Sequence, residues 1–244
     1  MLTRTMKNIE CSFAPLRFCA FALNPLKHFI SPLYRVLLCA FALPFVGCSS
    51  PSQQTATVEQ EIKGRDYEGK RFAVYRVRVP QEWIRRDPLP NESLHDTTKA
   101  ICEFIIKEDS GIIRIAIHNF ASETIDQRIP PSAQIARWQG QFESLSPLES
   151  SSTPQSFSGY SGLFFKGVGV LKGEEVMVLG WSLQIAPEHY RMLSRYETKE
   201  LNKEMRADVT IKAVGLKELM EIHQEEIDLF AHSFELIEEI PESL

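Results

Sequence analysis

The sequence predicts a single α+β domain in which an antiparallel sheet is packed between helices. Three observations predict it. Apolar runs come in pairs joined by short turns, at 100–107 with 111–120 and at 162–171 with 175–185. Apolar residues recur at helical spacing in 133–145 and 216–236. The chain shows no alternation of strand and helix, so the pattern favours an antiparallel sheet over a doubly wound parallel sheet.

Residues 1–47 are predicted to be a signal segment that the mature protein lacks. An apolar run of eleven residues, Val36–Val46, follows Arg35 and ends just before Gly47 and Cys48. This run is well short of the roughly 20 residues that a membrane-spanning helix needs. A permanent transmembrane anchor is therefore the weaker interpretation of the segment.

The residues Phe45-Val46-Gly47-Cys48 resemble the lipobox of bacterial lipoproteins, although Phe45 and Val46 depart from the usual leucine and small residue. The resemblance implies that Cys48 becomes the first residue of the mature chain and carries diacylglycerol and an N-acyl group. The lipid bilayer would then be the first partner of the protein. Conventional cleavage that leaves Cys48 as a free thiol is the alternative.

The part before the apolar run is long for the basic region of a signal. Its segment Cys19–Leu23 recurs as Cys39–Leu43. We therefore expect translation to begin at Leu26, which would leave residues 1–25 untranslated; mutation of the upstream methionines tests this. Residues 48–63, rich in Ser, Gln, Thr and Glu, are predicted to be a lipidated flexible tether, and 64–244 the globular domain.

The elements of the domain follow in order. Apolar and basic residues alternate in 71–80, which predicts a strand with one solvent-exposed face, and Trp83 is expected to be buried just after it. The turns Asp109-Ser110-Gly111 and Lys172-Gly173 predict two hairpins between the paired apolar runs. Two prolines open the helix at 133–145, and a Ser- and Pro-rich loop is expected at 146–158. A short helix at 187–196, a strand at 208–215 and a long amphipathic helix at 216–236 complete the domain.

Charge and cysteine usage exclude several classes of function. Removal of residues 1–47 takes away five basic residues and one acid, which shifts the net charge from −5 to about −9. Such a protein has no overall attraction to nucleic acid or anionic lipid. With Cys48 lipidated, Cys102 has no partner for a disulfide, and its apolar surroundings predict a buried, inert thiol. We expect no cofactor and no metal.

Histidines supply the weak signals for catalysis or metal binding. His223 and Glu226 lie three residues apart on one helix face, a spacing that metals can use. His223 also falls on the apolar stripe of that helix, which favours a packed, hydrogen-bonded side chain. His118 and His232 are isolated in sequence. The alternative function, an envelope hydrolase or metal-dependent enzyme, would require these groups to converge in a pocket.

Several motifs together resemble a known family. They are Val79–Trp83, Arg137–Phe142, and Thr210–Gly215 running into Glu226–Phe234. The pattern is similar to uncharacterised bacterial lipoproteins with the PsbP-like α/β/α sandwich, over roughly residues 67–237. The resemblance implies a binding or assembly module, because the characterised relatives are accessory proteins and not catalysts. It carries no active-site residues onto this chain.

The leading hypothesis is a membrane-tethered, non-catalytic module that binds another envelope protein or a small ligand. The candidate contact is an exposed polar site at Arg137, Trp138 and Gln141, where Arg137 and Gln141 lie beside Trp138 on one helix. Trp138 itself has the flanking periodicity of a core residue. Ser49 follows the lipidated cysteine, which by resemblance to lipoprotein sorting in Gram-negative bacteria favours the periplasmic face of the outer membrane. A surface antigen or adhesin is the third alternative, and protease accessibility on intact cells separates it from a periplasmic protein.

Overall fold

The computed structural model describes residues 55–65, 71–89, 97–195 and 200–238. The expected signal segment 1–47 and the lipidation site Cys48 lie outside these ranges. All of the described residues belong to one compact unit.

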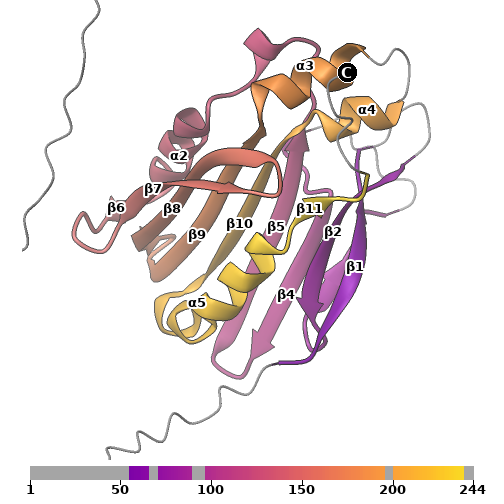
Figure 1. Cartoon of the computed structure of the whole chain (residues 1–244). Coiled ribbons are helices and arrows are strands. Elements are labelled where there is room, and N and C mark those ends of the chain that lie inside the picture. Colours follow the sequence, from indigo (N-terminus) through magenta and orange to yellow (C-terminus); the bar gives the residue numbers. More distant parts are fainter. Residues whose placement is uncertain (1–54, 66–70, 90–96, 196–199, 239–244) are drawn as a thin grey trace, which may run out of the picture. The chain divides into compact units, whose positions relative to one another are not determined.

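The larger of two antiparallel sheets holds eight strands (Figure 1). Its strands follow the order β3-β4-β5-β10-β9-β8-β6, and β7 pairs with β8. All of these described pairings are antiparallel, which confirms the predicted α+β class. The strands are β3 (Ile84–Arg86), β4 (Cys102–Glu108), β5 (Gly111–Phe120), β6 (Ser144–Leu145), β7 (Ser151–Phe157), β8 (Tyr160–Leu171), β9 (Glu174–Ile185) and β10 (Asp208–Leu216).

Both predicted hairpins are present. Strands β4 and β5 pair in register around Asp109 and Ser110. Strands β8 and β9 are joined by Lys172 and Gly173, whose φ angles are 55° and 79°. Two consecutive residues with positive φ form a turn whose twist matches that of a hairpin, and glycine adopts this conformation without strain.

A smaller sheet has the order β1-β2-β11 and contains β1 (Thr57–Lys63), β2 (Ala73–Pro80) and β11 (Glu235–Leu236). Strand β1 corrects the predicted tether, which was expected to extend to residue 63. The polar sequence of β1 conceals an alternation in which Ile62 is buried while Glu59 and Glu61 are exposed. Pairing with β2 and burial of one face therefore outweigh its low hydrophobicity.

Helices cover both faces of the larger sheet, as predicted. Helix α5 (Lys217–His232) packs on one face, termed the inner face, and α2 (Pro131–Gln139) packs on the opposite, outer face (Figure 1). Three short helical segments complete the set: the 3-10 helix η1 (Ile125–Gln127), α3 (Pro187–Arg195) and α4 (Glu200–Met205). Within the described ranges, no helix is long and apolar enough to cross a bilayer.

Two predicted boundaries in the middle of the chain were wrong. The helix expected over 133–145 ends at Gln139, because Gly140 occupies its C-cap and the chain then forms β6 against β8. The loop expected over 146–158 contains strand β7. Pro154 is tolerated there because β7 pairs with β8 alone among the described strands, so the edge needs no hydrogen-bond donor from it.

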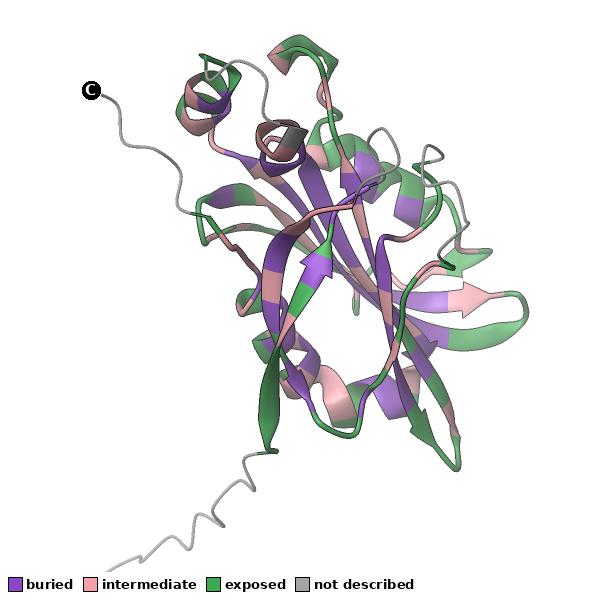
Figure 2. Cartoon of the chain, turned by 90° about the vertical axis from the view of Figure 1, so that its right-hand side faces the viewer, coloured by how far each residue is buried: buried purple, intermediate pink, exposed green. Residues whose placement is uncertain are grey.

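The main core lies between the inner face, α5 and the smaller sheet. Phe104 and Phe230 meet edge to face at 5.2 Å between ring centroids, and Tyr75 lies 4.7 Å from Phe234. Figure 2 shows buried residues running along the strands of both sheets and exposed residues at the tips of the hairpins. Helix α5 ends at His232, four residues earlier than expected, and Phe234 then enters this core.

Candidate functional site

Strand register gathers cationic side chains on the outer face of the larger sheet. Residues paired across antiparallel strands point to the same side. Lys212 on β10 pairs with Ala116 on β5 and with Gly180 on β9. Arg114 on β5 pairs with Val214 on β10, one row further along the same face. Lys212 and Arg114 are therefore diagonal neighbours.

Three more cations belong to this region. Arg86 on β3 lies in the same row of paired residues as Lys212, because Arg86 pairs with Glu103 and Glu103 with Ala116. Lys107 on β4 pairs with Ile112, one row beyond Arg114, and Arg137 projects from α2. Lys212 is half-buried, and the other four are exposed. The five residues Arg86, Lys107, Arg114, Arg137 and Lys212 are termed the basic patch.

Two acids share the outer face of these strands in the described chain, and both already have cationic partners. Glu103 accepts a hydrogen bond from Arg114. Asp208, at the far end of β10, is paired with Arg128. The basic patch therefore retains a strong excess of positive charge.

Helix α2 is seated by Trp138, whose ring lies directly on Gly180. A Cβ at residue 180 would lie 2.3 Å from Cζ3 of Trp138, so this approach requires glycine. The ring centroid of Trp138 is 6.5 Å from that of Phe165. The residues after α2 then reach β10, where the Lys212 ammonium donates to Oε1 of Gln141 at 2.5 Å and lies 5.9 Å from the Trp138 ring centroid.

The local environment makes the charge of Lys212 unfavourable. Burial, followed by the positive charges of Arg137 and Arg114, lowers the pKa of Lys212 from 10.5 to about 8. Arg137 has no hydrogen bond or ion pair to any described residue that would offset this repulsion. An anion placed among these three groups would relieve the repulsion and raise the pKa of Lys212 again, so the arrangement suits an anionic ligand.

Apolar side chains lie beside the basic patch: two are exposed, and the third, Ile105, is only 4% exposed. Ile84 is 48% and Ile112 54% exposed. Ile105 pairs with Ile84 and lies diagonally opposite Ile112. These three residues are termed the isoleucine strip. Helix α2 makes its main contacts with β8 and β9, so it leaves this part of the outer face open.

The three candidate contacts predicted around α2 have different environments. Arg137 and Gln141 are exposed beside Lys212, whereas Trp138 is only 5% exposed. Trp138 therefore holds the helix on the sheet and does not form a surface contact. That Arg137 and Gln141 bind a ligand stays a prediction.

The three histidines weighed as metal ligands lie apart. Burial lowers the pKa of His118 to about 4. His223 has Nδ1 at 3.2 Å from Glu226 and Nε2 at 3.5 Å from Glu108. His232 contacts its own helix and β7. Within the described ranges, no group of three or more His, Cys, Asp or Glu residues could hold a metal ion.

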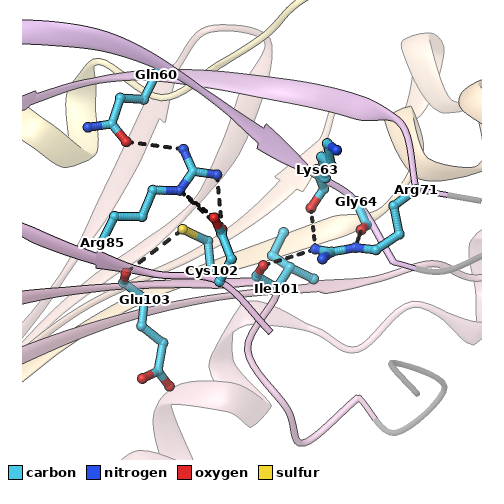
Figure 3. Close-up of polar contacts among 9 residues, drawn as sticks. Gln60, Lys63, Gly64, Arg71, Arg85, Ile101, Cys102 and Glu103 are labelled. Carbon is cyan, nitrogen blue, oxygen red and sulfur yellow. Dashed lines mark hydrogen bonds and ion pairs between the residues drawn. The ribbon is translucent and has the colours of Figure 1, made fainter. Parts of the chain in front are cut away.

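Cys102 is buried, as predicted, on the inner face of β4 near a seam between β3 and β1 (Figure 3). Arg85 of β3 donates across the seam to Gln60 of β1 at 3.1 Å, and it also holds Asp87. Arg71 donates to carbonyl oxygens on both sides of the seam. Burial raises the pKa of the Cys102 thiol to about 12, which leaves the thiol unreactive.

Two buried charged clusters near the start of β10 were not predicted from the sequence. The Arg128 guanidinium lies 2.6 Å from Asp208, with exposed side-chain fractions of 5% and 8%. Glu204 accepts hydrogen bonds from the Arg65 backbone at 2.9 Å and from Asn119 at 2.6 Å. Burial raises the pKa of both acids, and hydrogen bonds from these partners oppose it. Their contacts tie strands to loops, a structural role.

Comparisons with known proteins identify similar folds. No family model matches the chain. No curated protein matches it either. Solved structures similar to it include LpqN of Mycobacterium tuberculosis, described as involved in cell envelope biogenesis, with 11% identity, 73% of this chain and 91% of that chain covered, and a TM-score of 0.45.

Two further similar structures cover nearly all of their own chains. The cyanobacterial PsbP of Synechocystis has 13% sequence identity and a TM-score of 0.40, and the aligned region includes 78% of this chain and 98% of the PsbP chain. A protein of unknown function from Pseudomonas aeruginosa has 8% identity, covers 77% and 99%, and has a TM-score of 0.35. Similarity at this level concerns the fold, and no activity follows from it.

Proposed function

We propose that the protein is a lipid-anchored binding module of the bacterial envelope, without catalytic activity, and that it holds an anionic partner at the basic patch. The observation that carries the proposal is the gathering of five cations on one face of an acidic domain. Such a patch attracts and orients an oppositely charged partner, although the protein as a whole repels anions.

The energetics of Lys212 support a binding role for the patch. Arg137 and Arg114 disfavour the charged form of Lys212. A titratable side chain whose pKa is strongly perturbed by burial and by neighbouring like charges is a candidate for function. Gln141 accepts one hydrogen bond from Lys212, but its amide carries no charge and cannot neutralise the ammonium.

The lipid anchor is supported by the sequence before the domain. The lipobox resemblance supports lipid attachment at Cys48, and Ser49 favours the periplasmic face of the outer membrane. An envelope hydrolase or metal-dependent enzyme is disfavoured by the separation of the described histidines. Uptake of a fatty-acid analogue by the wild-type protein and its loss in Cys48→Ala test the anchor.

Binding at the patch is tested by affinity capture from crosslinked cells of the native host, with the full-length lipidated protein. The variant Arg137→Glu/Lys212→Glu should reduce recovery of the partner by at least about tenfold. The variant Arg191→Glu, which reverses an exposed charge on α3, should leave recovery unchanged. Equal recovery with all three proteins would exclude the basic patch as the binding surface.

A further inference from the structure

Helix α2 covers only part of the outer face of the larger sheet. Helix α2 packs on β8 and β9 through Ile135 and Trp138. Beyond them the sheet continues through β10, β5, β4 and β3. Val214 of β10 packs against the cluster under α2, which leaves β5, β4 and β3; neighbouring strands lie about 4.8 Å apart, so these three strands span about 10 Å. A helix with its side chains is about 10 Å wide, so one more helix fits alongside α2.

The open part of this face holds side chains that would be favourable to bury. Ile84 and Ile112 are about half exposed, whereas Ile105, which lies on the strand between theirs, is already buried at 4% exposure. Scattered single apolar residues are common on protein surfaces. The isoleucine strip differs because the buried Ile105 joins the two exposed members, so that the three come from three adjacent strands and share one face.

Cations flank the isoleucine strip on both sides. Arg86 comes from the edge strand β3 and Lys107 from its neighbour β4, whereas Lys212 and Arg137 lie toward α2. Arg114 stands between the two sides. An occupant with an apolar stripe bordered by acids on both sides therefore matches the surface in polarity and in charge.

We propose that the partner presents an amphipathic helix with acidic borders, which docks on the isoleucine strip alongside α2 and completes the outer helical layer. This inference rests on the proposed function and names the kind of partner. A small anion would use the cations and leave the isoleucines exposed. A flat bilayer would meet α2, which stands above the sheet, before it reached the strip, and the net charge of the domain opposes anionic lipid.

Photocrosslinking at the strip tests the proposal directly. The full-length protein, produced in its native host, carries p-benzoylphenylalanine at position 112, and a matched protein carries it at Leu229, which is 65% exposed on α5. Mass spectrometry identifies the attached segment. We expect position 112 to capture one protein segment with apolar residues at three- and four-residue spacing and flanking acids, and position 229 not to capture it. Lipid adducts, absence of a protein adduct, a basic or non-helical segment, or the same adduct at position 229 would overturn the proposal.

Polar substitutions separate this inference from the proposed function. Ile84→Asn and Ile112→Asn change exposed side chains, so thermal unfolding should stay unchanged while recovery of the partner falls at least about tenfold. If Arg137→Glu/Lys212→Glu abolishes recovery but the two asparagine variants do not, the proposed function stands and the helix docking is wrong. If no variant changes recovery, both are wrong.

Discussion

Replacement of Gly180 by alanine should unseat α2. The added Cβ would lie 2.3, 2.8 and 3.0 Å from three carbons of the Trp138 ring, whereas carbon contacts are most favourable at about 3.5–4.0 Å. Trp138 is 5% exposed and packs near Phe165, so the ring has little room to move. We expect a loss of about 1–3 kcal/mol in the free energy of unfolding, the usual range for overpacking.

Urea denaturation of matched variants measures this effect. Gly140→Ala makes the same chemical change at the end of α2, where φ is −68° and the nearest atoms lie 3.5 and 3.7 Å from the new Cβ. That variant should be neutral or stabilised by up to about 1 kcal/mol. Trp138→Phe, with its smaller ring, should cost less in the Gly180→Ala background than in the wild type. A Gly180→Ala protein within about 0.5 kcal/mol of wild type would refute the packing described for α2.

Three further predictions concern titratable groups. The Lys212 side chain should titrate near pH 8 when followed by NMR. An unfolded lysine titrates near pH 10.4, so between these two values the unfolded chain binds more protons than the folded chain. The free energy of unfolding should therefore rise with pH across this window, and Lys212→Met should abolish the rise. Asp208→Asn should lower the free energy of unfolding, measured by chemical denaturation, by about 3–5 kcal/mol, because it leaves the buried charge of Arg128 unpaired. The double variant Asp208→Leu/Arg128→Met should recover most of this loss. A loss under about 1 kcal/mol for Asp208→Asn would contradict the prediction. Cys102 should resist a thiol reagent at pH 8 in the folded protein and react fully in urea, and rapid labelling of the folded protein would disprove its burial.

The sequence predicted the elements in which local signals agree with the fold. Both hairpins combine apolar runs with short turns, and the amphipathic helix α5 has a clear period. Strand β1 was missed because its burial depends on Ile62 alone and on pairing with β2, which local composition does not reveal. Strand β7 was missed because Ser and Pro are typical of loops, and its partner β8 supplies the stability.

The candidate site could be predicted only in part. Helical position and residue type pointed to Arg137 and Gln141, but not to Lys212, which joins them through the register of β10. Period-two alternation in 111–120 does place Ile112 and Arg114 on one face. Which strand lies next to it, and which side of the sheet α2 covers, are long-range facts that no local pattern contains. Trp138 was grouped with the candidate contacts although the periodicity around it is more typical of a core residue, and its 5% exposure agrees with the core interpretation.

The start of β1 at Thr57 has a mechanical consequence. With lipid on Cys48, as proposed, residues 49–56 are the only linker between the lipidated residue and strand β1. Eight residues extend at most about 29 Å, so the folded domain works within a thin shell of space above the membrane. A partner in the same membrane would meet it at an effective concentration in the millimolar range. Contacts that are weak between free molecules in solution would then be close to saturated where the protein resides.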